Sequence, residues 1–495
     1  MSDTLTSTSE ADEAPPNGDE PKPRRDLSDR FGWSAITAMT LGVAATWLPL
    51  LFLPLGDFHS GRVDGRYALH VRNLFEKGLV GSDFSADWSP YGQFPYAHWP
   101  PLRNALAALA GLLPGEGPYE PRIGTYAIAL LAIPAAAALL RAFGVRWIPT
   151  LVAVALMAAT PFFWVYANQK FDLALILAIC AAVVRIRRDP DPPRWLIVGA
   201  SVLALLATLA TWPGIAITGL LLLWLIGTRR RLDRVVLWFG VAAAVGVALS
   251  LLFVVGITGM DRLVGQTEMR TGGGVTFVEL FLRQGRYYLT LLPVWYLALV
   301  PLGFVAALMR KQTRFFMACA IAVTAIWIVG LRNGAYIHEF WGFLVLVPGV
   351  LGMGVLLDKA VTLVSDRWVR VAAVAVCAAL AVFVASMALG GVGDRYYYRP
   401  ARAGDLVMET PPAAGQQYAW NSGLPAARWL AYYWDLPPRT ITVKALTERG
   451  NPDDLVVLRL DDLPAWLPRS VATHAVRTEG NYALVRVADV LAAAE

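Results

Sequence analysis

The sequence predicts an α-helical membrane protein with many spans and a small α/β domain at its C-terminal end. Of its 495 residues, 56% are hydrophobic and only 16% are charged, a balance typical of integral membrane proteins. Apolar runs of roughly 20 residues, the length that crosses a bilayer, recur along most of the chain. About eleven spans are expected, at 33–55, 122–141, 147–166, 171–187, 195–212, 213–228, 235–258, 288–309, 315–331, 337–357 and 368–390.

The segments before and between these runs have their own signatures. Residues 1–30 are rich in Pro, Ser, Asp and Glu and contain no apolar stretch, which predicts a disordered tail and no signal peptide. The apolar run 102–113 is too short to cross a bilayer and predicts a re-entrant or interfacial helix. At Trp212-Pro213 two spans meet in a tight turn, because proline cannot continue the first helix.

Positive charge indicates the orientation. The basic clusters on one side are Lys22, Arg24, Arg25 and Arg30; Arg141 and Arg146; Arg185, Arg187, Arg188 and Arg194; Arg229, Arg230, Arg231 and Arg234; Arg310, Lys311 and Arg314; and Lys359, Arg367 and Arg370. The short opposite loops carry only Lys170 and Arg332. Because basic loops stay in the cytoplasm, we expect a multi-pass plasma (inner) membrane protein with a cytoplasmic N-terminus.

Two outer loops and one outer domain follow from this orientation. The membrane domain is expected at 31–391, with outer loops at 56–121 and 259–287, and an extracytoplasmic domain at 392–495. In the second loop the triglycine 272–274 predicts a flexible joint, and Phe277–Leu282 an amphipathic surface helix. In the C-terminal domain the expected strands are 441–443, 455–458 and 482–487, with a helix at 424–434.

Candidate chemistry gathers directly after the first span. Asp57, His59 and Asp64 lie there, and His98 lies in a downstream run rich in aromatic residues and proline, 88–102. Acidic groups held at a membrane surface beneath an aromatic loop suit chemistry on a lipid-linked polar substrate. The three cysteines lie inside apolar runs and show no disulfide or metal-binding spacing.

Short motifs follow one another in an order that resembles the GT-C superfamily of polytopic glycosyltransferases. The likeness is to the branch of the protein O-mannosyltransferases and the lipid A aminoarabinose transferases. Val63-Asp64-Gly65-Arg66-Tyr67-Ala68 resembles the family's Asp-Glu pair followed by an aromatic residue, and His98-Trp99-Pro100-Pro101-Leu102 is similar to its basic residue and Pro-Pro-Leu element. The Asp-Gly pair and the histidine are departures, and they leave the sugar and any metal open.

Four later motifs extend the resemblance over most of the chain. Residues 159–162 and 171–175 resemble the family's helix end and the Asp-containing helix start that follows it. Residues 337–341, with Pro348 after them, resemble its His-acidic-aromatic start of a late span. Residues 431–434 resemble the paired tyrosines of its C-terminal domain.

The resemblance implies transfer of a sugar from a polyprenyl-phosphate carrier to a protein, lipid or glycan acceptor on the outer face. A prenyl chain, held in lipid by about 0.8 kcal/mol per buried CH₂, does not leave the bilayer, so its enzyme must bring a polar site to the membrane surface. A carboxylate must accept the acceptor's proton. We predict Asp64 as this base, with Asp57 second. A single base favours an inverting enzyme, because a retaining one uses a second carboxylate as nucleophile.

The departing phosphate needs cationic or hydrogen-bonding partners. The candidates for the donor and its phosphate are Arg66, His98, Arg103, Lys170, Arg270, Arg332, His338 and Glu339. Asp172 either lines the site or pairs structurally with Lys170. Structural alternatives also stay open for Asp64, as a helix cap, and for His98, as part of an aromatic belt.

A metal requirement and two other functions stay open. A divalent metal stays open, since no close ligand spacing is present and phosphate with cationic support is an adequate leaving group; no nucleic-acid partner is expected. The first alternative is a transporter or flippase of lipid-linked sugars, but we see no inverted repeats with broken helices. The second is a non-catalytic membrane scaffold, which would tolerate replacement of Asp64.

Overall fold

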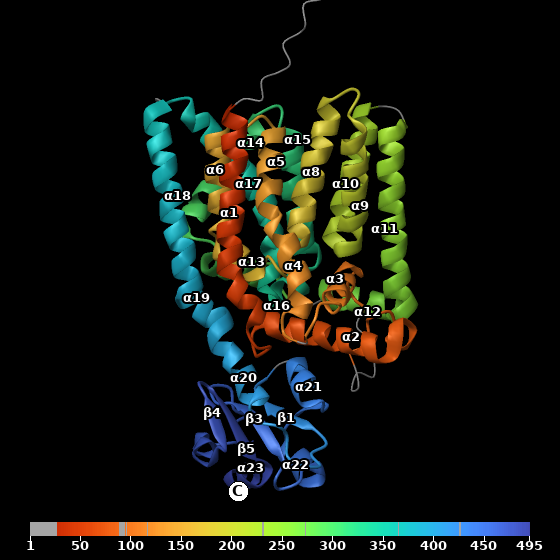
Figure 1. Ribbon diagram of the computed structural model, residues 1–495, viewed down its shortest axis with the longest axis vertical. Helices are drawn as coiled ribbons and strands as arrows, with labels where there is room; N and C mark the ends of the chain where they lie inside the picture. The colour runs from red at the N-terminus through yellow and green to blue at the C-terminus, as the bar shows by residue number, and fades with distance from the viewer. Residues whose placement is uncertain are drawn as a thin grey trace, which may run out of the picture.

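The long helices pack side by side into one bundle, and a small sheet domain lies beyond one end of it (Figure 1). The computed structural model describes residues 27–88, 95, 97–115, 117–229, 232–272, 274–364, 366–424 and 427–495. Most of the predicted tail, part of the 88–102 run and Gly273 of the triglycine lie outside these residues. We call the end of the bundle that faces the sheet the sheet-domain end.

The helices of the bundle overlap the ranges expected for spans. Their bounds are α1 Leu27–Phe52, α4 Glu120–Leu130, α5 Ala132–Ala142, α6 Trp147–Ala158, α7 Pro161–Tyr166, α8 Asp172–Arg188, α9 Arg194–Ala210, α10 Trp212–Arg229, α11 Arg234–Thr258, α14 Val294–Met309, α15 Arg314–Gly330, the 3₁₀ helix η1 Glu339–Val345, α17 Leu346–Val361 and α18 Asp366–Leu389. Among the described residues, six helical segments are long and apolar enough to cross a membrane, or seven if one bent pair counts as a span. The chain is therefore a multi-pass membrane protein.

The bent pair corrects one predicted span. The run expected at 288–309 is not one straight helix. The helix axis bends by 117° between α13 (Phe277–Leu291) and α14. Pro293 lies in the break, where its ring and its missing N–H end one helix and suit the start of the next. The surface helix predicted at 277–282 is longer than expected, because it continues to this break. It begins with a capping box between Thr276 and Glu279 and runs on until Leu291.

Short helices cover the sheet-domain end of the bundle. They are α2 His59–Gly81, α3 Leu102–Ala110, α12 Met260–Thr271, α13 and α16 Arg332–Ile337. In Figure 1 the α2 ribbon runs across the end of the bundle, between it and the sheet domain. The helix α3 lies where the short apolar run predicts one, and the tight turn at Trp212-Pro213 joins α9 to α10.

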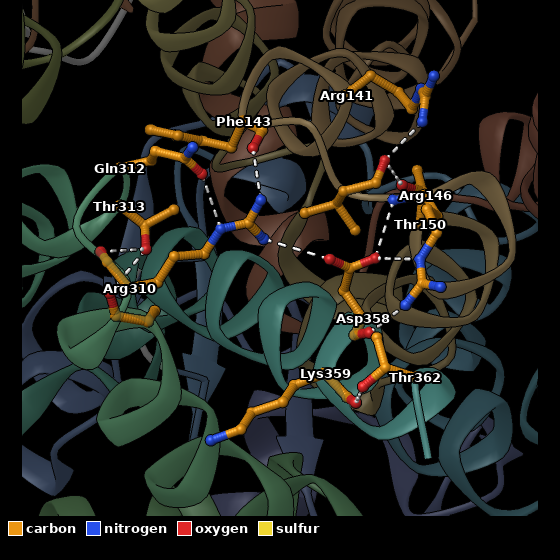
Figure 2. Close-up of polar contacts among 12 residues, drawn as sticks. Arg141, Phe143, Arg146, Thr150, Arg310, Gln312, Thr313, Asp358, Lys359 and Thr362 are labelled. Carbon is orange, nitrogen blue, oxygen red and sulfur yellow. Dashed lines mark hydrogen bonds and ion pairs between the residues drawn. The ribbon is translucent and has the colours of Figure 1, made fainter. Parts of the chain in front are cut away.

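The opposite end is tied together by the Asp358 carboxylate (Figure 2). Its Oδ1 accepts hydrogen bonds from the backbone N–H and Nε of Arg146, at 3.1 and 2.9 Å, and its Oδ2 pairs with Arg310 at 3.3 Å. Arg310 also donates to the Phe143 carbonyl at 3.1 Å. One acid thereby joins the α5–α6 turn, the α14–α15 turn and the end of α17.

The C-terminal domain is a mixed sheet with helices around it. The strands are β1 Ala419–Ser422, β2 Pro438–Thr440, β3 Leu455–Arg459, β4 Arg477–Glu479 and β5 Tyr482–Arg486, in the order β2-β1-β3-β5-β4. β1 pairs in parallel with β2 and β3, whereas β5 is antiparallel to β3 and β4. The other elements are α19 Gly391–Gly393, the π-helical turn η2 Asp394–Tyr398, α20 Arg399–Met408, α21 Arg428–Trp434, α22 Val443–Arg449, the 3₁₀ helix η3 Arg469–His474 and α23 Val487–Ala494.

One predicted strand of this domain is wrong. The apolar run 441–443 follows β2 instead of forming it, because the Thr442 side chain accepts a hydrogen bond from the Ala445 N–H and caps α22. A threonine N-cap is a strong helix start, and it outweighs the β-branched composition of this short run. The runs expected at 455–458 and 482–487 are the strands β3 and β5. The helix expected at 424–434 is described as α21, starting at Arg428.

Candidate active site

A cavity of about 150 Å³ lies at the sheet-domain end of the bundle. We call it the basic cavity. Its walls come from α2, α3, α9, α12 and η1 and from the connections before α3, α8, α10 and η1. The lining residues are His59, Val63, Arg66, Tyr67, Trp99, Arg103, Gln169, Lys170, Phe171, Ala210, Thr211, Arg270, His338, Phe340 and Trp341.

Four of these side chains are cations, and all four were predicted for phosphate binding. Arg66 on α2, Arg103 on α3, Lys170 before α8 and Arg270 on α12 meet here although they are far apart in sequence. None of the lining residues in the described part of the chain is a carboxylate. A cavity lined by these basic side chains favours an anionic ligand. Fixed cations in a partly buried site attract an anion more strongly than cations in water do.

Buried donors around the cavity have no acceptor. Nε of Arg103, Nε2 of Gln169 and Nε1 of Trp341 make no hydrogen bond with the described residues. An unpaired buried donor costs about 1–3 kcal/mol. A ligand with several acceptor oxygens is the arrangement that would satisfy all three.

The histidines near the cavity are neutral bases at physiological pH. Burial lowers the pKa of His59 to about 3, with His338 and nearby arginines adding to the effect. Burial and then Arg270 lower the pKa values of His98 and His338, each to about 4. Burial also lowers the pKa of Lys170, an effect that the charge of Asp172 opposes, so the positive charge of the cavity comes chiefly from its arginines.

Asp64 lies behind the cavity wall. Its side chain is fully buried, with Oδ1 2.8 Å from Nη2 of Arg103 and Oδ2 2.9 Å from Nε of Arg122. The Ser60 hydroxyl donates to the same Oδ2 at 2.7 Å. The carboxylate thus holds Arg103, a lining residue, in place.

Arg122 is the functional neighbour that the sequence reasoning missed. It is 1% exposed and donates to the carbonyl oxygens of Leu50, Leu51 and Leu53 at the end of α1, at 3.0, 3.2 and 2.5 Å. Its position at the very start of the apolar run 122–141 was the available signal, because an arginine there needs a partner. It links Asp64 to the first span.

Asp57 contacts the sheet domain and not the cavity. Its carboxylate pairs with Arg62 at 2.7 Å and with Arg459 of β3 at 3.3 Å, and it accepts a hydrogen bond from the Tyr482 hydroxyl of β5 at 3.3 Å. Burial raises the pKa of Asp57 above its usual range, and the two arginines oppose that effect. Asp57 therefore joins the start of α2 to the C-terminal domain.

The remaining predicted residues lie around the cavity in different roles. Asp172 is 2% exposed and accepts a hydrogen bond from the Thr211 hydroxyl at 2.7 Å. Glu339 accepts one from the Tyr166 hydroxyl. Arg332 lies over the Phe277 ring, 5.7 Å from its centroid, and does not line the basic cavity. Among the described residues no group of three His, Cys, Asp or Glu side chains is placed to share a metal ion.

A second cavity of about 320 Å³ adjoins the first. We call it the apolar cavity. The two share Arg270 and Trp341, and His98 lines the second and not the first. Its lining residues are His98, Trp212, Val254, Thr258, Leu263, Gln266, Thr267, Arg270, Trp327, Leu331 and Trp341. The apolar cavity therefore meets the basic cavity at Arg270 and Trp341.

Comparison with known proteins gives matches among solved structures alone. No family model matches the chain, and no curated protein matches its sequence. The crystal structure of ArnT from Cupriavidus metallidurans in the apo state matches with a TM-score of 0.53 and 18% identity, covering 94% of this chain and 100% of ArnT. The structure of the same protein bound to undecaprenyl phosphate matches with a TM-score of 0.54 and 18% identity, covering 92% and 98%.

A third match is the archaeal oligosaccharyltransferase AglB from Archaeoglobus fulgidus, in complex with an inhibitory peptide and a dolichol-phosphate. It has a TM-score of 0.47 and 13% identity and covers 88% of this chain and 70% of AglB, too distant to carry an argument. The two ArnT matches span nearly the whole of both chains. This chain therefore has the fold of the ArnT structures.

Proposed function

We propose that this chain is an inverting glycosyltransferase of the plasma membrane that moves a sugar from a polyprenyl-phosphate carrier to an acceptor on the outer face. The observation that carries the proposal is the basic cavity, whose described lining residues include Arg66, Arg103, Lys170 and Arg270 and no carboxylate. Phosphate oxygens are strong acceptors for such donors.

The junction of the two cavities supports a lipid-linked phosphate over a free one. Arg270 lines both cavities, so a phosphate bound there has the basic cavity on one side and the apolar cavity on the other. A prenyl chain stays in apolar surroundings by burying its CH₂ groups. A water-soluble phosphate has no apolar chain that could occupy the apolar cavity.

Apolar space for a prenyl chain continues beyond the apolar cavity along two helices. Trp212 of α10 and Trp327 of α15 line the apolar cavity. About one to two turns along the same helices, Ile217 and Thr324 line a further apolar pocket between α8, α10 and α15. We propose that the carrier lipid follows this line of apolar spaces.

The fold supports the same substrate class. The ArnT structure that matches this chain along 92% of its length holds undecaprenyl phosphate. The basic clusters of the sequence support an outer-face position for the sheet-domain end, and we propose that the acceptor is a protein, lipid or glycan reached from that side. Which sugar is moved is a question for a donor panel.

Asp64 remains the predicted base. To accept a proton, its Oδ1 must exchange the Arg103 contact for the acceptor hydroxyl, because Arg122 and Ser60 already occupy Oδ2. Transition-state charge on the phosphate would be stabilised by the cavity cations. We propose Asp57 as a link to the sheet domain and not as the second base.

Release of polyprenyl phosphate from a panel of polyprenyl-phosphate sugars tests the proposal, with the purified full-length protein in lipid nanodiscs. Turnover of one sugar donor by the wild type is the expected result and identifies the donor. Binding of donors without any turnover, over a broad set of acceptors, would contradict the proposal and favour transport. The Asp64→Asn variant, compared at equal donor occupancy, tests the base separately.

A further inference from the structure

Aromatic rings of the basic cavity already contact cations of the protein itself. Nζ of Lys170 lies 5.0 Å from the ring centroid of Trp99 and 5.1 Å from that of Phe340. The Arg270 guanidinium lies 5.9 Å from the Trp99 centroid and 5.5 Å from the Trp341 centroid. All five residues line the cavity. Rings of this kind commonly bind cationic ligands, but here such a ligand would meet a protein cation at each of the three.

Carboxylates that could pair with a cationic ligand are missing from the described wall of the cavity. The run 88–102, part of which lies outside the described residues, contains no Asp or Glu. Asp64 lies behind the wall, bound to Arg103, and the proposed function assigns it to the acceptor hydroxyl. Asp172 is buried and accepts its hydrogen bond from Thr211. The wall therefore offers a positive group on the ligand no described counter-ion.

Three unpaired polar atoms of the wall are donors that need an acceptor. Nε of Arg103, Nε2 of Gln169 and Nε1 of Trp341 have no hydrogen-bond partner among the described residues. A hydroxyl or carboxylate oxygen of a sugar can accept from them, whereas an ammonium group only donates. Replacing a sugar hydroxyl by an ammonium group would therefore leave these buried donors with one acceptor fewer, and buried donors without acceptors are costly.

The net charge of the donor depends on its sugar. The phosphodiester between a prenyl chain and a sugar carries one negative charge. A neutral sugar leaves this charge unchanged, and an acidic sugar adds a second. An ammonium group on the sugar cancels it, so the donor as a whole is no longer attracted by the fixed cations of the cavity.

We infer that the donor sugar carries no ammonium group: the basic cavity admits neutral or acidic sugars and rejects amino sugars, an inference that rests on the proposed glycosyl transfer. With the phosphate at Arg270, where the two cavities meet, the sugar occupies the basic cavity, whose wall also holds Arg66, Arg103 and Lys170. A positive group on the sugar is repelled there, and like charges brought together in this way discriminate strongly between ligands. This selection acts on the donor and leaves Asp64 as the base.

Matched donors test the selection with the full-length protein in lipid nanodiscs. The donor identified by the panel is compared with amino-deoxy analogues, in each of which one sugar hydroxyl is replaced by an amino group. At about pH 6.5, where such amines are protonated, we expect kcat/KM for the analogues to be lower by about 100-fold or more. Toward about pH 9 the amine loses its proton, and the difference should shrink to about 10-fold or less.

Three results would overturn the inference. The first is a panel in which the donor that is turned over is itself an amino sugar. The second is a kcat/KM for the analogues within about 3-fold of the parent at the lower pH. The third is a difference that does not change with pH, which would mean that size and not charge excludes the amine. A wild type that turns over no donor would instead refute the proposed function, so the two failures are distinguishable.

Gln169→Glu tests the wall itself, because it adds a carboxylate at a lining position and keeps the shape of the side chain. We expect it to raise kcat/KM for the amino analogues relative to the parent donor by about 10-fold or more at the lower pH. Gln312→Glu is the matched control, since Gln312 lies beside Arg310 at the opposite end of the bundle (Figure 2). A wild-type ratio in both variants would overturn the role of the wall, and the wild-type comparison stands if Gln169→Glu fails to fold.

Discussion

Oδ1 of Asp64 lies 2.8 Å from Nη2 of Arg103, and this ion pair joins a fully buried carboxylate to the wall of the basic cavity. The second oxygen of Asp64 binds Arg122, which in turn holds the end of α1. One acid thus ties the first helix of the bundle to the ligand-facing side of α3. Its removal has consequences for stability as well as for binding.

Asp64→Asn should destabilise the protein and weaken donor binding together. Two buried guanidinium groups lose their counter-ion, and breaking a buried pair in this way costs about 3–5 kcal/mol. Thermal unfolding in detergent and donor titration measure the two effects. Asp435→Asn is the control, because Asp435 pairs with Arg72 but is 70% exposed, and an exposed pair contributes about 0–1 kcal/mol. Loss of turnover with unchanged donor affinity and stability would mean that Asp64 acts as the base without stabilising the position of Arg103.

Arg270→Met should weaken binding of polyprenyl phosphate more than any change outside the cavities. Arg270 lies where the basic and apolar cavities meet. Loss of a charged hydrogen-bonding partner costs about 1.5–3 kcal/mol, which is roughly 10- to 100-fold in affinity. Equilibrium binding of undecaprenyl phosphate measures it. Arg286→Met, an exposed arginine of α13 that lines neither cavity, should bind as the wild type does, and equal losses in both variants would contradict the assignment.

Gly65→Ala should disturb the contact between α2 and α21. A Cβ at Gly65 would lie 2.7 Å from both the backbone N and Cα of Trp429, and neither helix backbone can yield without moving the other. Overpacking of this kind typically costs about 1–3 kcal/mol. Gly42→Ala in α1 is the matched control, because nothing lies within 4 Å of its added Cβ. Equal melting temperatures for the two variants would show that α21 does not press on α2.

Stability should fall as the pH is lowered from about 6.5, the ordinary pKa of histidine, toward 4. The pKa values of His59, His98 and His338 are lowered by burial to about 3, 4 and 4. Between these pH values the histidines bind protons in the unfolded chain but not in the folded chain. The free energy of unfolding therefore decreases as the pH falls. Melting temperatures measured across this range test it. His338→Gln should flatten the dependence, and an unchanged slope would mean that His338 titrates normally.

Arg459→Met should loosen the start of α2. Arg459 of β3 pairs with Asp57 at 3.3 Å across the contact between the sheet domain and the membrane domain. With that cation removed, the buried carboxylate keeps Arg62 and Tyr482 as partners, and amide hydrogen exchange near residue 57 should speed up. Arg449→Met changes an exposed residue of α22 and should leave exchange there unaltered. Equal exchange in both variants would remove Arg459 from this contact.

Much of the membrane architecture follows from the sequence by itself. Apolar runs predicted helices in the ranges now occupied by α1, α8, α10 and α11, because burial in lipid is a local requirement that each segment meets with its own side chains. The order of short motifs predicted a fold that the ArnT structures share, and four residues predicted for phosphate binding line one cavity. Local capping, however, overrode strand propensity at 441–443, and Pro293 broke an apolar run into two helices.

The pairing of the acidic residues was decided by tertiary structure alone. Asp64 meets Arg103 and Arg122 from 39 and 58 positions away, and Asp57 meets Arg459 from 402 positions away. Hydropathy and motif spacing specify which segments are helices and which lie at the membrane surface. They do not specify which buried charge faces which, because that depends on how non-neighbouring elements pack. The sequence therefore determined a basic, membrane-surface site, and packing decided that Asp64 holds an arginine while Asp172 accepts a hydrogen bond from Thr211.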